Sequence, residues 1–118
     1  MHKVNVNVLS GAATGSITGA KIDSNQLVAA SFQIVTGDSA VAGTVKIQAS
    51  NDICNDQYQP DQFTPTNWSD IPSATSTVAA GVGPLITLNQ LSYRWMRVVF
   101  TRTGGTTTIN INMFAIAP

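Results

Sequence analysis

The stretch YRWMRVVFTRTGGTTTININMFAIA, residues 93–117, decides the fold class. Two runs in it alternate between apolar and polar residues, as the two faces of a half-buried β-strand do. The apolar faces consist of Met96, Val98 and Phe100 in the first run and Ile109, Ile111, Met113 and Ala115 in the second. Gly104 and Gly105 lie between the runs, and glycine readily adopts the positive φ of a tight turn. The stretch therefore predicts two long strands joined as a hairpin.

Alternation of the same kind recurs along the rest of the chain. The further predicted strands are VNVNV (4–8), QLVAASFQIVTG (26–37), TVKIQAS (44–50), NWSDIPS (67–73) and LITLN (85–89). In VNVNV the valines lie on one face. Residues 26–37 and 44–50 are separated by turn-forming residues, so they predict a second hairpin with one solvated face. Pro72 is expected to stop the strand that contains it.

About eight short strands and no sustained 3.6-residue apolar period predict an all-β protein. The expected architecture is an antiparallel β-sandwich, jelly-roll-like in topology. The single cysteine, Cys54, excludes an immunoglobulin-like sandwich held by an internal disulfide. The terminal strands, VNVNV and ININM, are expected to pair with each other or across a subunit boundary.

A length of 118 residues fits one domain with its own core, spanning residues 1–118. Residues 10–25, SGAATGSITGAKIDSN, are rich in small residues and offer only Ile17 and Ile22 as anchors. This segment predicts a mobile connection or an N-terminal arm.

Charge is scarce and balanced. Only 10% of the residues are charged, and six basic residues match six acidic ones for a net charge of zero. Nucleic-acid binding draws on clustered positive charge, so a nucleic-acid partner is not expected. A neutral surface does little to keep copies of a protein apart, and this favours a homo-oligomer or incorporation into an assembly.

The sequence shows no basic, apolar start of the kind that directs secretion, and no apolar run of the ~20 residues that span a membrane. Neither a signal peptide nor a membrane partner is expected. The chain reads as a soluble protein made in a cytoplasm.

The long loop SNDICNDQYQPDQFTPTNWSDI (50–71) holds four of the six aspartates and the only cysteine. Its oxygen donors, Asn51, Asp52, Asn55, Asp56 and Asp61, do not follow the spacing of an EF-hand, and Asn and Asp are ordinary turn residues. A Cys54 nucleophile would need the one histidine, His2, as its base. We expect no metal, no cofactor and no catalysis.

Aromatic residues are the remaining candidates for function. Tyr58 and Phe63 lie in the long loop and are equally consistent with an interface and with core packing, whereas Trp68 is expected to plug the core. Trp95 and Arg97 share the face opposite Met96, which predicts an Arg–Trp stack on an outer face. The candidate partner-binding residues are therefore Tyr58, Phe63, Trp95 and Arg97.

The segments VKIQASND (45–52), NWSDIP (67–72) and YRWMRVVFTRTGGTTTININ (93–112) together resemble a pattern in small β-sandwich proteins of tailed-phage virions. A looser likeness extends to discoidin-type sandwiches, which share the Ser-Asn-Asp turn, the tryptophan and the Arg-bearing strand. The chain departs from the pattern by inserting ICNDQYQPDQFTPTN (53–67) between Ser-Asn-Asp and the tryptophan. Such an elaborated loop is the part most free to carry partner-specific contacts.

The resemblance implies a structural protein of a bacteriophage virion. The first expectation is a capsid decoration or stabilising protein. It would bind other virion proteins, above all the major capsid protein, and copies of itself. A tail or fibre-associated component is the nearest variant. The competing expectation is a carbohydrate-binding module or receptor-binding adhesin, with the loop aromatics as its platform.

Overall fold

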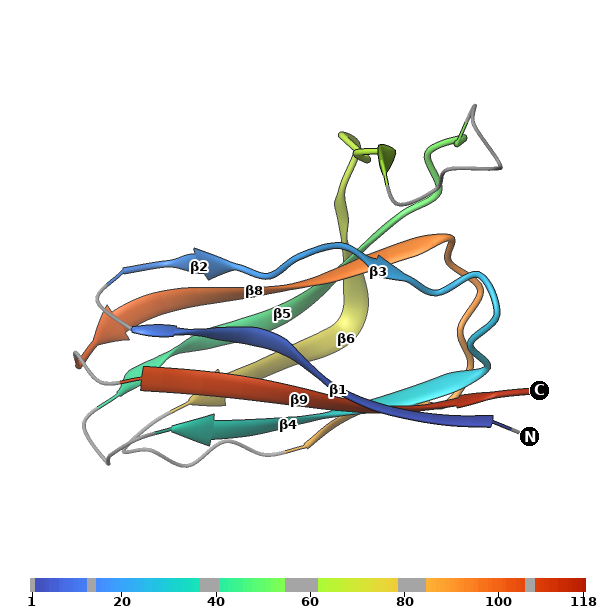
Figure 1. The fold of residues 1–118 in the computed structure, drawn as a ribbon. Helices are drawn as coiled ribbons and strands as arrows, with labels where there is room; N and C mark the ends of the chain where they lie inside the picture. Colours follow the sequence, from blue (N-terminus) through green and yellow to red (C-terminus); the bar gives the residue numbers. More distant parts are fainter. Residues whose placement is uncertain (1, 13–14, 37–40, 55–61, 79–84, 106–107) are drawn as a thin grey trace.

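The computed structural model describes residues 2–12, 15–36, 41–54, 62–78, 85–105 and 108–118, and over these residues the chain forms two packed β-sheets and no α-helix (Figure 1). The all-β sandwich predicted from the sequence is confirmed. In chain order the strands are β1 (His2–Ala12), β2 (Ile17–Thr18), β3 (Ile22–Asp23), β4 (Ala29–Thr36), β5 (Ala42–Ser50), β6 (Ser69–Val78), β7 (Ile86–Leu88), β8 (Trp95–Gly104) and β9 (Thr108–Ala117).

The strand order is that of a jelly roll. One sheet, sheet A, has the order β1-β9-β4-β7, and the other, sheet B, has the order β2-β8-β5-β6 with β3 also paired to β8. Every pairing is antiparallel. Since β2 and β3 both pair with β8, they act as two pieces of one strand. Apart from that break, the chain changes sheet at every connection except the one between β5 and β6.

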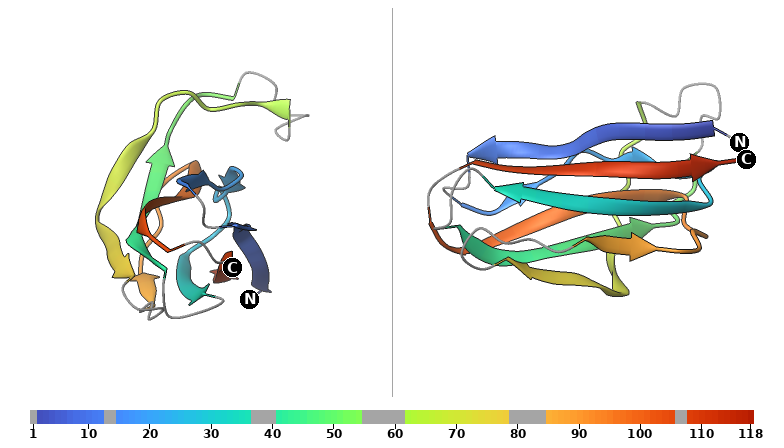
Figure 2. Two further views of the ribbon diagram at one scale, coloured as in Figure 1. Left: turned by 90° about the vertical axis from the view of Figure 1, so that its left-hand side faces the viewer. Right: turned by 90° about the horizontal axis from the view of Figure 1, so that it is seen from below.

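Both predicted hairpins are wrong. Strands β4 and β5 lie in different sheets, and so do β8 and β9, so each pair faces across the core (Figure 2). Alternation correctly identified the buried face of each strand, but it says nothing about which strand lies beside it. Strand β8 pairs with β5 instead, with Phe100 opposite Val45, and β9 lies between β1 and β4.

The core lies between the sheets and includes the alternating residues that the sequence indicated in β4, β5, β8 and β9. Its largest fully buried members are Phe32, Val41, Val45, Ile47, Val78, Met96, Val98, Phe100, Ile109, Ile111 and Met113. The terminal strands pair with each other inside the chain, with Val4 opposite Ala115 and Val6 opposite Met113.

Two strands carry irregularities that the sequence pattern did not show. The register of β1 shifts between Asn7 and Leu9, so Val8 leaves the alternation and Leu9 takes the buried place. Strand β6 continues past Pro72, contrary to the expected stop, and its register with β5 shifts there. Proline is tolerated because β6 is an edge strand, where one side of the backbone needs no partner.

In the segment predicted as a connection or arm, residues 10–25, the first three residues end β1 and pair with β9, whereas residues 17–23 lie along β8. Strand β2 pairs with Phe100 and Val99, β3 pairs with Met96 and Trp95, and Gly19 between them donates its amide to the Val98 carbonyl at 2.8 Å. A side chain on Gly19 would meet the Val8 carbonyl at 2.5 Å. Glycine therefore allows the close approach of this segment to its neighbours.

Candidate functional site

The elaborated loop and three other features gather at one end of the sandwich (Figure 1). Residues 51–68 connect β5 to β6 there, residues 24–28 connect β3 to β4, and residues 89–94 connect β7 to β8. The two chain ends lie at the same end, since His2 is opposite Ala117. We call this region the loop end.

Trp95 is at the centre of the loop end. Its side chain lies on the face of β8 opposite the main core, yet it is only 1% exposed because other side chains cover it. The Phe63 ring stacks on the indole with a centroid distance of 5.7 Å and an interplanar angle of 27°. The Arg94 guanidinium lies 4.0 Å from the ring centroid and the Lys21 ammonium 5.3 Å from it. Trp95 thus anchors the loop to the sheet.

The predicted site residues therefore have different placements. Phe63 is half-buried on Trp95, and Trp95 itself is not accessible in this conformation. Arg97 is half-buried on the outer face of sheet B. Tyr58 lies outside the described residues.

Trp68 is not in the core, so that expectation is wrong. The ring is half-buried on the outer face of sheet B, with the Arg97 guanidinium 4.4 Å from its centroid, and its indole N–H donates to the Pro65 carbonyl at 3.1 Å. The predicted Arg–Trp stack does form, but Arg97 pairs with Trp68 and Arg94 with Trp95. Because Trp68 precedes β6, alternation within that strand could not set its direction.

A polar chain extends from the Arg97–Trp68 stack across three strands of sheet B. Arg97 donates its Nε–H to Gln48 Oε1 at 2.8 Å, and Gln48 Nε2 donates to Asp70 Oδ1 at 2.9 Å. Lys46 Nζ completes the chain at 3.4 Å from Asp70 Oδ2. The hydrogen bond from Gln48, followed by that from Lys46, lowers the pKa of Asp70.

Asp52 holds the base of the long loop closed. Its Oδ2 accepts the backbone N–H groups of Thr66 and Asn67 at 2.7 and 3.0 Å, and its Oδ1 accepts the Asn67 side-chain amide at 2.9 Å. The backbone donor of Asn67 is the largest cause that lowers the pKa of Asp52, followed by that of Thr66. The Ser-Asn-Asp turn thereby ties residue 52 to the strand that returns after the loop.

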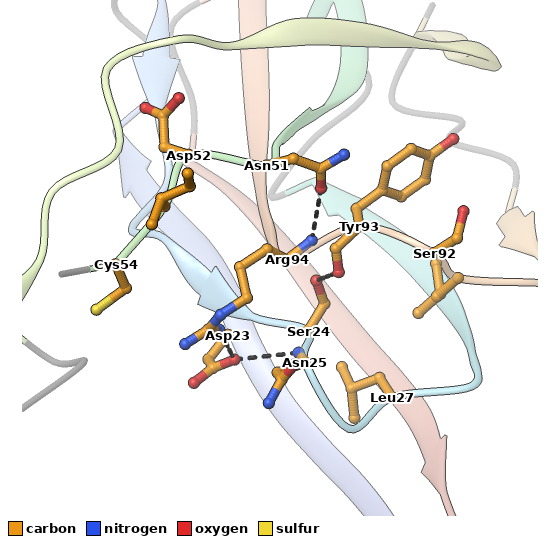
Figure 3. Close-up of a pocket in the computed structure, with 12 residues that line it drawn as sticks. Asp23, Ser24, Asn25, Leu27, Asn51, Asp52, Cys54, Ser92, Tyr93 and Arg94 are labelled. Atoms are coloured by element: carbon orange, nitrogen blue, oxygen red, sulfur yellow. Dashed lines mark hydrogen bonds and ion pairs between the residues drawn. The ribbon is translucent and has the colours of Figure 1, made fainter. Parts of the chain in front are cut away.

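Beside this base, twelve residues from three connections line an open depression of about 770 Å³ (Figure 3). Arg94 reaches across it to form an ion pair with Asp23, and the Arg94 backbone N–H donates to Asn51 Oδ1 at 2.9 Å. The Ser24 hydroxyl donates to the Tyr93 carbonyl at 2.7 Å. Leu27, Ile53 and Leu91 add apolar surface. The depression is therefore lined by both hydrogen-bonding and apolar side chains.

Sequence reasoning did not single out Asp23, Asn51 or Arg94 as parts of one feature. They come from three connections that meet only because β3, β5 and β8 are adjacent in sheet B. The nearest sequence signals were the Ser-Asn-Asp turn and the dense cluster at residues 93–97.

Among the described residues, no group of three or more His, Cys, Asp or Glu side chains is placed to hold a metal ion. Asn55, Asp56 and Asp61 lie outside those residues. His2 begins β1 in sheet A, whereas Cys54 follows β5 of sheet B. A search of the described residues also found no helix long and apolar enough to cross a membrane.

No family model matches the sequence, and no curated protein matches it significantly. Among solved structures, the crystal structure of the SPBc2 prophage-derived protein YomS is similar, with a TM-score of 0.57. The match covers 98% of this chain and 94% of that chain at 10% sequence identity. The two proteins share a fold over almost their whole lengths. At this identity the likeness shows the fold alone.

Proposed function

We propose that this protein is a structural component of a bacteriophage virion, and specifically a capsid decoration or stabilising protein. The observation that carries the proposal is the shared fold with a prophage-derived protein, which leaves almost no part of either chain unmatched. The sequence resemblance to small virion sandwiches points to the same class of protein. The protein would act by contacts with the major capsid protein and with its own copies, without catalysis and without a cofactor.

The loop end is the surface we assign to the capsid partner. Ile53 stands at the rim of the depression with 81% of its surface exposed, above the rigid base that Asp52 and Trp95 provide. An exposed apolar side chain on an ordered support loses little conformational entropy when a partner covers it. The polar side chains around it supply hydrogen bonds at the edge of such a contact.

Immunogold electron microscopy of the phage that encodes the protein tests the location. Antibody label distributed over the capsid supports decoration. Label confined to the tail or fibres would instead identify the tail-associated variant, and particles without label would overturn the proposal.

Ile53→Asp tests the assigned surface in a capsid co-sedimentation assay. We expect the charged side chain to reduce capsid binding at least tenfold, because a carboxylate would be desolvated at the contact. Thr77→Asp, at an exposed position of β6 in sheet B, is the control and should bind as the wild type does. Equal binding by all three proteins would contradict the assignment to the loop end.

A second candidate function is carbohydrate binding, and the depression favours it. Sugars are recognised where planar hydrogen-bonding side chains lie beside apolar surface, and Asp23, Asn25, Asn51 and Arg94 offer such groups next to Leu27 and Leu91. A glycan array should then show saturable binding that is lost in Asn25→Ala and kept in Asn89→Ala. A flat array would exclude this candidate.

A further inference from the structure

Charge is distributed unequally between the two sheets. Over the described residues, Lys3 near the start of β1 is the one Asp, Glu, Lys or Arg in the strands of sheet A. The strands of sheet B contain Asp23, Lys46, Asp70, Arg97 and Arg102. Only 10% of the residues in the chain are charged, and sheet A carries fewer of them than sheet B.

The register of sheet A shows what this face displays. Strands β1, β9 and β4 run side by side along the molecule (Figure 2). Their outward residues form four rows across the three strands: Lys3, Ile116 and Ala29; Asn5, Phe114 and Ser31; Asn7, Asn112 and Gln33; and Ser10, Asn110 and Val35. The apolar residues Ala29, Phe114 and Ile116 thus lie near the loop end, beside Lys3 at the edge of the face, and the amides lie mostly toward the opposite end.

Two apolar side chains on this face are strongly exposed to solvent. Phe114, on β9 between β1 and β4, is 41% exposed, and Val35 on β4 is 43% exposed. Beside Phe114 a groove of about 180 Å³ runs between β4, β7 and β9, lined by Ala29, Leu88 and Ile116 among others. An exposed aromatic side chain next to an apolar groove is typical of the centre of an interface.

Hydrogen bonds between neighbouring strands order the amide side chains of this face. Asn7 Nδ2 donates to Asn112 Oδ1 at 3.1 Å, and the Ser10 hydroxyl donates to Asn110 Oδ1 at 2.8 Å. Each asparagine side chain carries two donor hydrogens and an acceptor oxygen. A surface that contains both donors and acceptors and almost no charge is complementary to itself.

We propose that the outer face of sheet A is the interface between two copies of this chain, with Phe114, Asn110 and Asn112 of β9 in its contact. A second copy fits because a two-fold interface brings the same patch from both partners together, and only a patch without like-charge repulsion can do this cheaply. This inference deepens the proposed function, in which copies assemble on a particle, but it concerns a surface distinct from the loop end.

The size of the face indicates which class of interface the dimer would have. Three strands about 4.8 Å apart and about ten residues long present on the order of 500 Å² per partner. A standard stable interface buries roughly 800 Å² per partner, so this one belongs to the weak class. The dimer should therefore form at high protein concentration, or where a particle holds the copies close together.

Sedimentation velocity of the purified protein between about 10 µM and 1 mM tests the proposal. We expect a sedimentation coefficient that rises with concentration toward that of a dimer. The double variant Asn110→Asp/Asn112→Asp keeps both acceptor oxygens and the volume of the side chains, but it places four carboxylates at a two-fold contact. We expect its dimer dissociation constant to rise about tenfold or more.

Thr75→Asp/Thr77→Asp is the matched control, since it adds the same charge to exposed positions of β6 in sheet B. It should associate as the wild type does, and circular dichroism should show that both variants fold. A wild type that remains monomeric up to 1 mM would overturn the proposal, and so would equal weakening by both double variants. Capsid binding that is lost in the sheet A variant of a monomeric protein would assign the face to another virion protein. None of these results decides the Ile53 assay, so the two proposals can fail separately.

Discussion

At the residue scale, Trp95 and Asp52 attach the described residues of a long insertion to sheet B. The indole is buried under Phe63 on the outside of sheet B, and the carboxylate accepts both backbone N–H groups at the point where the chain returns. These contacts hold the two described ends of the loop. An insertion held in this way can carry a recognition surface without destabilising the sandwich.

Phe63→Ala should uncover Trp95. The loss of a stacked ring is expected to lower the free energy of unfolding by about 1–2 kcal/mol and to increase acrylamide quenching of Trp95 fluorescence. A Trp68→Phe background isolates that signal, and Phe114→Ala is the control for loss of a phenylalanine elsewhere. Unchanged quenching would show that other groups cover Trp95.

Asp52→Asn should destabilise the protein at neutral pH more than at acidic pH. The folded-state pKa of Asp52 is lowered below its ordinary 3.8, so its stabilising contribution is present above that pH and is lost as the pH falls through the folded-state pKa. Urea unfolding at pH 7 and pH 3 should show a difference between wild type and variant that shrinks at pH 3. A difference of equal size at both pH values would contradict this role.

At the element scale, the sandwich depends on positions where strands depart from regular geometry. The bulge at Val8 turns Leu9 inward, and the irregular stretch around Pro72 bends the edge strand β6. Ser73 has a φ of 64°, the one positive φ of a non-glycine residue among those the structure describes. Irregular edges of this kind resist pairing with strands of other molecules.

Ser73→Gly should stabilise the protein, because glycine adopts this φ without the steric cost that serine has. We expect a gain of roughly 0.5–1 kcal/mol in urea unfolding. Thr75→Gly, two residues further along the same strand at a regular position, should instead lose a similar amount. A loss for both variants would show that Ser73 is not strained.

Gly19→Ala should loosen the contact of the β2–β3 segment with β8. The added methyl group would meet the backbone carbonyl of Val8, which cannot move aside as a flexible side chain would. We expect a loss of about 1–3 kcal/mol and faster amide hydrogen exchange at residue 19. Gly15→Ala is the control because a side chain there meets nothing within 4 Å, and equal effects of the two variants would contradict the explanation.

At the scale of the whole molecule, the jelly roll separates the two proposed contact surfaces in space. The loop end collects the elaborated loop, the depression and both chain ends, whereas the outer face of sheet A carries little charge. Under the two proposals, each copy would bind a particle with one end and one further copy with the outer face of sheet A, so the protein would attach as two-fold dimers. The two proposals therefore describe one mode of assembly.

The same topology should make folding slow. Strand β1 pairs with β9 across almost the entire chain, and β5 pairs with β8, so the sheets form from distant segments. Proteins dominated by such pairings fold in milliseconds to seconds. Stopped-flow tryptophan fluorescence after dilution from urea should show a phase in that range, and complete folding within microseconds would contradict this expectation.

The sequence by itself determined the class of fold and the composition of the core. Alternation with a period of two requires only neighbouring residues, so the inward faces of β4, β5, β8 and β9 could be assigned from the chain alone. The neutral composition and the anomalous loop were equally visible. Apart from the pairing of the two terminal strands, which was one of two expected arrangements, tertiary structure alone decided which strands are neighbours, because pairing partners far apart in sequence leave no local trace. It also decided that Trp95 is covered and Trp68 is not in the core, since the burial of a residue on an outer face depends on which distant segment packs against it.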